Sequence, residues 1–155
     1  MTGIAVFPSV TVRREIEASA DELFDAWLDP AALAVWMCPG GVTHSVASLE
    51  AREGGSFEIT MHAPSEAYWH RGVYQRIDRP RQLVFTWISA ATHETESLVT
   101  VDFKATTRSG YTEVVVTHER LPDRDAACSH TEGWSDALAS LGELEWLRSL
   151  NDPEA

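Results

Sequence analysis

Basic residues are scarce in this sequence. Its 155 residues include 12 Lys and Arg against 24 Asp and Glu, and Lys104 is the single lysine. A formal charge of −12 argues against nucleic acid as a partner, because phosphate binding needs clustered basic side chains. A polybasic membrane patch is missing for the same reason, and the apolar runs are too short to span a bilayer. The N-terminus lacks the basic and apolar regions of a signal peptide, so we expect a cytoplasmic protein.

Cysteine and cofactor motifs are also scarce. Cys38 and Cys128 are the 2 cysteines, far apart in sequence. Spacing alone leaves a disulfide open, but two reduced thiols suit a cytosolic protein better, and no sequence feature marks Cys38 as an activated nucleophile. The 6 histidines form no His-x-x-x-His pattern, and the chain contains no P-loop, dinucleotide fingerprint or nucleophile elbow. We expect no metal and no cofactor.

The order of predicted elements indicates a single α+β domain over residues 1–155. Alternating β-branched residues predict a strand over 10–17, and Ser19 with Glu22 forms a capping box before a short helix. Asp29 and Pro30 begin a second short helix. Further strands are expected over 42–51, 56–61, 68–77, 82–89, 98–106 and 111–119. A long helix follows the sequence Leu121-Pro122-Asp123. Helices grouped at the ends of an antiparallel run are typical of the α+β class.

The last helix carries a regular apolar stripe. Its members recur at helical spacing and are His130, Trp134, Leu138, Leu141 and Leu144. A strongly curved sheet has one apolar face, and this stripe is its expected cover.

Six segments of the chain match one known family. They are Trp27-Leu28-Asp29-Pro30 with Leu33 and Trp36, Gly54-Gly55-Ser56-Phe57, His70-Arg71-Gly72-Val73-Tyr74, residues 77–87, Val116-Thr117-His118-Glu119, and His130 with Gly133-Trp134. In this order, from about Val10 to Leu150, the chain resembles the activator-of-Hsp90-ATPase homologue family of the START-like superfamily. The resemblance implies a helix-grip fold, in which a seven-stranded antiparallel sheet holds a long C-terminal helix with a cavity between them. It does not imply one function, since the superfamily includes lipid carriers, hormone receptors, polyketide cyclases and co-chaperone domains.

Aromatic residues give the strongest functional indication. The chain has 6 tryptophans, and large aromatic walls suit an apolar ligand, although a packed core explains the same pattern. The residues expected to line the cavity are Trp36, Phe57, Ile59, Met61, His70, Tyr74, Phe85, Trp87, Val99, Phe103, His118, His130, Trp134 and Leu138. Alternation over 68–77 leaves open which face is inward, that of His70 and Tyr74 or that of Arg71 and Val73. A bulge near Gly72 would reconcile the two.

Two histidines are the main polar candidates. His118 ends a strand on an apolar face, and His130 begins the buried stripe of the last helix, so both could meet at one end of the cavity. There an imidazole could bind a ligand or act as a general acid or base. The alternative is a histidine satisfied by a backbone carbonyl. Gly133 beside Trp134 lowers helix propensity, which suggests either close packing or a local bend.

Three functions follow from these observations. The first is a domain that binds a hydrophobic small molecule, as a monomer or a homodimer. The second is a regulator of a partner ATPase, which the family resemblance and the acidic stretch 121–155 favour, although such a charge run is more often a solvated helix face. The third is a cyclase, hydratase or hydrolase that uses a cavity histidine.

Overall fold

A computed structural model describes residues 7–143 of the chain. The elements, in chain order, are β1 (Val10–Ile16), α1 (Ala20–Leu28), α2 (Pro30–Trp36), β2 (His44–Leu49), β3 (Ser56–His62), β4 (Ala67–Asp78), β5 (Gln82–Trp87), the 3₁₀ helix η1 (Ala90–Thr92), β6 (Ser97–Ala105), β7 (Thr112–Glu119) and α3 (Arg124–Leu141). The predicted order of strands and helices is confirmed. Leu144, which we expected in the helical stripe, lies outside the described residues.

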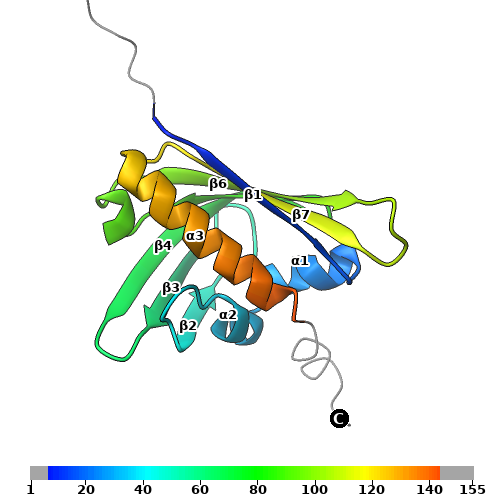
Figure 1. The fold of residues 1–155 in the computed structure, drawn as a ribbon, viewed down its shortest axis with the longest axis horizontal. Coiled ribbons are helices and arrows are strands. Elements are labelled where there is room, and N and C mark those ends of the chain that lie inside the picture. Colours follow the sequence, from blue (N-terminus) through cyan, green and yellow to red (C-terminus); the bar gives the residue numbers. More distant parts are fainter. Residues whose placement is uncertain (1–6, 144–155) are drawn as a thin grey trace, which may run out of the picture.

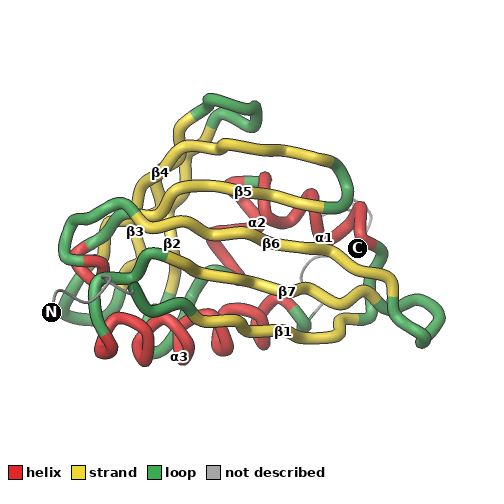
Figure 2. Tube along the Cα trace, turned by 90° about the horizontal axis from the view of Figure 1, so that it is seen from above, coloured by secondary structure: helices red, strands yellow, loops and turns green. Residues whose placement is uncertain are grey.

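The seven strands form one antiparallel sheet in the order β1-β7-β6-β5-β4-β3-β2, which leaves β1 and β2 at its edges. From β2 to β7, strands that follow one another in the chain are also neighbours in the sheet. The link from β1 to β2 instead joins the two edges of the sheet and carries α1 and α2. The sheet curves around α3, and the two short helices cover one end of the same concave face (Figures 1 and 2). This is the helix-grip arrangement of the α+β class that the sequence predicts.

The helices α1 and α2 begin at the residues that the sequence indicates. The Ser19 hydroxyl accepts the Glu22 amide at 3.1 Å, and the Glu22 carboxylate accepts the Ser19 amide at 3.4 Å, which completes the predicted capping box. The Asp29 carboxylate caps α2 through the amide of Ala31, 3.0 Å away. The Asp123 carboxylate caps α3 in the same way.

The inward face of β4 is the one that carries His70, Gly72 and Tyr74, all of which are buried. The bulge lies between Tyr74 and Arg76 rather than near Gly72, and beyond it Ile77 packs against the core. Gly72 is required by close packing, because a Cβ there would lie 1.9 Å from the Thr86 carbonyl oxygen.

Aromatic rings fill the half of the interior under α1 and α2. Trp36 is fully buried, and its indole nitrogen donates to the Ala26 carbonyl at 2.9 Å. Its ring lies 4.7 Å from that of Trp27, and Phe24 packs against Phe103 at 5.3 Å. This half of the hollow is therefore solid core.

The sequence pattern predicts the end of β5 and the effect of Gly133 on the last helix less well. β5 ends at Trp87, two residues earlier than expected, and a 3₁₀ turn that was not predicted follows at Ala90–Thr92. Gly133 does not break α3, which is continuous from Arg124 to Leu141. Among the described helices, none is both long and apolar enough to cross a membrane.

Candidate ligand-binding site

A cavity of about 480 Å³, open to solvent on one side, lies at the other end of the concave face. Four parts of the chain enclose it: residues 37–42 after α2, the ends of β3 and β4, the segment from Trp87 to Glu94, and the α3 residues 129–136. Its volume falls in the range of small-molecule sites, which is roughly 300–1,000 Å³.

Five of the fourteen candidate residues line this cavity: Met61, His70, Trp87, His130 and Trp134. The other nine do not line it and are buried elsewhere between the sheet and the helices: Trp36, Phe57, Ile59, Tyr74, Phe85, Val99, Phe103, His118 and Leu138. The cavity is thus confined to one end of the hollow, because α1 and α2 bring their own aromatic rings into the rest of it.

Trp87 and Trp134 form the inner wall. Their ring centroids are 5.3 Å apart, and Trp87 also packs against His70 at 4.8 Å. On its other side Trp134 stacks on Trp27 at 5.9 Å. Trp134 therefore contacts both the aromatic core and the cavity, as the phase of the α3 stripe predicts.

Gly133 also lines the cavity, and the close packing suggested for it from sequence is not observed. A Cβ at this position would meet only the Pro39 Cβ, at 3.9 Å, which is an ordinary contact. The absence of a side chain leaves space in the cavity next to Trp134.

His118 is held in the core by hydrogen bonds on both ring nitrogens. Its Nδ1 accepts the Trp134 indole N–H at 3.0 Å, so its proton lies on Nε2, which is 2.7 Å from the Ser97 hydroxyl. Ser97 in turn donates to the Trp87 carbonyl. Burial, with a smaller effect of the nearby His130, lowers the pKa of His118 to about 3. His118 is therefore neutral and has no nitrogen left to act on a ligand.

His130 differs from His118 although their ring centroids are only 4.6 Å apart. Its Nδ1 donates to the Ala126 carbonyl at 2.7 Å, and burial lowers its pKa. Among the described residues Nε2 has no hydrogen-bond partner, so a neutral His130 presents a lone pair at the cavity wall. His70 donates from Nδ1 to the Tyr68 carbonyl at 3.1 Å, and burial lowers its pKa to about 4.

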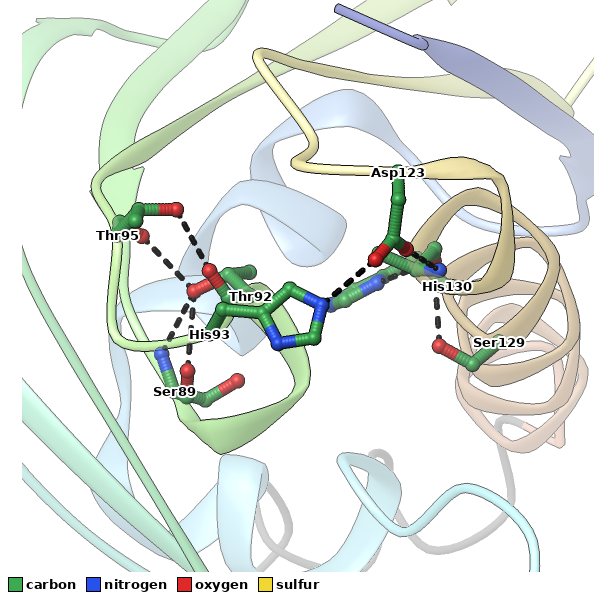
Figure 3. Close-up of polar contacts among 8 residues, drawn as sticks. Ser89, Thr92, His93, Thr95, Asp123, Ser129 and His130 are labelled. Carbon is green, nitrogen blue, oxygen red and sulfur yellow. Dashed lines mark hydrogen bonds and ion pairs between the residues drawn. The ribbon is translucent and has the colours of Figure 1, made fainter.

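A polar cluster that the sequence did not reveal lies near the cavity residues Ser129 and His130 (Figure 3). His93 lies in the segment after η1, and its Nε2 is 2.7 Å from the carboxylate of Asp123. Asp123 also caps α3, and its pKa is lowered chiefly by the Ala126 amide and then by His93. The pair joins the η1 segment to the start of α3. The sequence placed Asp123 just before the last helix but gave no signal for the partner 30 residues away.

The cavity rim was also missed. It includes the turn Pro39-Gly40-Gly41 and the exposed residues Tyr68 and Trp69. The Gly40 amide donates to Asp136 at 3.0 Å, which ties this turn to α3. The glycine-rich turn after α2 was visible in the sequence, but nothing there placed it against the last helix.

Other reactive groups give no alternative site. Both cysteines are free, as expected, and burial raises the pKa of Cys38, so its thiol is not activated. Within residues 7–143 no group of three or more His, Cys, Asp or Glu side chains is arranged to hold a metal ion.

The architecture defines a helix-grip domain of the START-like type. A model of the activator of Hsp90 ATPase homolog 1-like family matches residues 17–144, and the chain belongs to that family.

Solved structures share this fold at low sequence identity. Protein CV1439 of Chromobacterium violaceum has a TM-score of 0.75 and 22% identity, over 88% of this chain and 95% of that one. PFC0360w, an HSP90 activator from Plasmodium falciparum, has a TM-score of 0.68 and 21% identity, over 91% and 96%. CalU16 of Micromonospora echinospora has a TM-score of 0.64 and 22% identity, over 90% and 79%. No curated protein matches the chain.

Proposed function

We propose that this protein binds a small apolar molecule with an aromatic body in the cavity between its sheet and α3. The observation that carries the proposal is the pair Trp87 and Trp134, which face a 480 Å³ space that no side chain of the described residues fills. Indole rings offer a ligand both apolar burial and stacking. The unpaired Nε2 of His130 adds a polar point that would orient the ligand.

Enclosed and open surfaces are both present, as a binding site requires. The inner wall is nearly inaccessible to solvent, with Trp87 and Trp134 exposed by 3% and 4%, whereas Tyr68 and Trp69 at the rim are about half exposed. A ligand entering past the rim would lose water from its apolar surface at about 25 cal/mol per Å² buried. Such a gain suits a molecule of two or three fused or linked rings.

A titration with an uncharged dye tests the proposal. N-phenyl-1-naphthylamine fluoresces weakly in water and strongly in apolar surroundings, and we expect saturable binding of one dye per chain. Gly133→Leu adds a side chain at the cavity wall, where its Cβ would meet only Pro39 Cβ at 3.9 Å, and should weaken dye binding at least tenfold. Ser135→Leu adds the same side chain at an exposed α3 position outside the lining and should leave it unchanged. Non-saturable binding, or equal affinity in all three proteins, would refute a cavity site.

A second candidate function, regulation of a partner ATPase, is supported by family membership alone. It would be tested by adding the purified protein to an Hsp90-type chaperone and measuring ATP hydrolysis. No stimulation at a tenfold excess would remove it.

The hydrogen bonds of the two histidines leave one candidate acid or base for an enzymatic role. A cyclase or hydrolase acting in this cavity would use His130, because the ring nitrogens of His118 are both engaged. His130→Phe would then abolish turnover of a substrate found by screening, whereas retained turnover would exclude His130 as acid or base.

A further inference from the structure

Charged side chains around the cavity are of one sign. Its lining includes Glu94, Glu132 and Asp136 but no lysine or arginine. Arg71 is not part of the lining, but its guanidinium pairs with the lining residue Glu94 at 2.7 Å and stacks over Trp69 at 4.2 Å. Glu132 and Asp136 on α3 form no ion pair among the described residues, in a chain whose formal charge is already −12.

Three hydrogen-bond donors at the cavity are already engaged. The Ser129 hydroxyl donates to the Ala126 carbonyl, the Tyr68 hydroxyl to Glu66, and the Gly40 amide to Asp136. Two donors without a partner among the described residues, Trp87 Nε1 and Ser89 Oγ, are enclosed by protein rather than exposed to the cavity.

Hydrogen-bond acceptors remain available. Because Nδ1 of His130 carries its proton toward the Ala126 carbonyl, Nε2 has a lone pair and no partner in the described chain. The carboxylates of Glu132 and Asp136 add acceptors. A ligand whose polar end donates hydrogen bonds would meet these acceptors, whereas one whose polar end is a carboxylate would meet no lysine or arginine in the lining.

The aromatic faces of the cavity also favour a positively charged ligand. A cation within about 6 Å of an indole ring is attracted by the negative face of the ring, and more strongly where the cation is shielded from solvent. Trp69, Trp87 and Trp134 all line the cavity, and Trp69 already holds one guanidinium in this way.

We propose that the ligand is an organic amine, protonated at neutral pH, whose apolar body lies against Trp87 and Trp134 and whose ammonium group faces the acceptors of α3. This inference rests on the proposed function, since it specifies the ligand class of the same cavity. It excludes fatty acids, aryl carboxylates and phosphate esters as preferred ligands, because the lining offers them no cation.

Three probes with one ring system and different charge test this. Calorimetric titrations at pH 7.5 would compare 2-naphthylmethylammonium, 2-naphthylmethanol and 2-naphthoate. We expect the ammonium to bind about tenfold tighter than the alcohol, and the carboxylate to bind weakest. If the alcohol or the carboxylate binds as tightly as the ammonium, or if none binds while N-phenyl-1-naphthylamine does, the amine proposal fails and the proposed function stands. If neither the dye nor any naphthyl probe binds, both fail.

A charge-neutralising variant tests whether the α3 carboxylates cause the preference for the ammonium probe. Glu132→Gln combined with Asp136→Asn keeps the shape of both side chains and an oxygen for the Gly40 amide. Because exposed ion pairs contribute modestly, this variant should bind the ammonium about three- to tenfold more weakly and the alcohol with unchanged affinity. The control, Glu15→Gln with Glu17→Gln, removes two charges from exposed residues outside the lining and should change neither affinity. Equal ammonium affinity in the variant and the wild type would contradict the assignment of the acceptors to α3.

Discussion

The two ends of the concave face use the same aromatic chemistry to different effect. Under α1 and α2, Trp27, Trp36 and Phe24 pack against one another and the sheet and are buried. Under the middle of α3, Trp87 and Trp134 are equally buried from solvent but border an open space. The difference lies in the covering helices. Two short helices bring large side chains into one end, whereas α3 presents Gly133, which has no side chain, at the other.

His118 and His130 are in contact but differ in the same way, since one belongs to the core and the other to the cavity. Their rings touch at 4.6 Å, yet one is bonded through both nitrogens to core residues and the other has a nitrogen free at the cavity. Burial makes both rings neutral at pH 7. The boundary between core and site therefore passes between these two side chains.

Removing a tryptophan from each end should separate packing from binding. Trp36→Ala and Trp134→Ala should each lower the free energy of unfolding by about 3–5 kcal/mol, as loss of a large buried side chain does. Trp134→Ala also leaves Nδ1 of His118 without its donor. In urea titrations both losses should be similar, whereas dye affinity of the folded protein should fall only in Trp134→Ala. Near-wild-type stability of Trp134→Ala would mean that α3 has been placed in the wrong phase.

Alanine substitutions at two glycines compare how tightly the sheet and the cavity wall are packed. Gly72→Ala places a Cβ 1.9 Å from a backbone oxygen and should lower the free energy of unfolding by about 1–3 kcal/mol. Gly133→Ala meets only Pro39 Cβ at 3.9 Å and should raise it by up to about 1 kcal/mol through helix propensity. Thermal unfolding of both variants measures these opposite shifts. Destabilisation by Gly133→Ala would show that this end is packed after all.

Acid should weaken the fold through its neutral histidines. Burial lowers the pKa of His118 from the ordinary histidine value of 6.5 to about 3, so between these values the unfolded chain binds a proton that the folded chain does not. The free energy of unfolding should therefore fall, as pH falls from 6.5 toward 3, by about 1.4 kcal/mol per pH unit for this group. Its full contribution is present above pH 6.5.

Carboxylates also titrate in this range, so the test is a difference between proteins. His118→Leu will be less stable at pH 7.5, because Trp134 and Ser97 lose their partner. Urea titrations at pH 5.5 and 4.5 should nevertheless show a slope shallower than that of the wild type by about 1.4 kcal/mol per pH unit. An identical slope would mean that His118 is protonated in the folded state.

The smallest expected effect is at the polar cluster near the cavity. His93→Ala removes the contact between the η1 segment and Asp123. Because both side chains are about half exposed, global stability should not change measurably, but amide hydrogen exchange over residues 89–95 should become faster. Asp123→Asn is unsuitable here because it also alters the cap of α3. Unchanged exchange in His93→Ala would show that the pair does not hold the segment.

Local sequence patterns predicted the parts of the fold that neighbouring residues determine. The caps at Ser19 and Asp29 and the inward position of Phe85 and Trp87 follow from such patterns. The bulge after Tyr74 was misplaced, because either strand face could be inward until the pairing with β5 fixed the register.

The site was less predictable than the fold. Nine candidate residues are core because α1 and α2 fill the hollow beside them, and sequence gives no measure of how far a helix fills a curved sheet. The roles of His118 and His130 were separated only by contacts with Ser97, Trp134 and the Ala126 carbonyl, most of them distant in sequence.

The contrast between the two ends can be measured in one experiment. The protein is labelled with 5-fluorotryptophan, its ¹⁹F resonances are assigned by single Trp→Phe variants, and N-phenyl-1-naphthylamine is titrated in. The account predicts large shifts for Trp87 and Trp134, which line the cavity, and no shift for Trp36, which lies in solid core. A shift of Trp36 as large as those of Trp87 and Trp134, or saturable binding that leaves both cavity tryptophans unshifted, would contradict it.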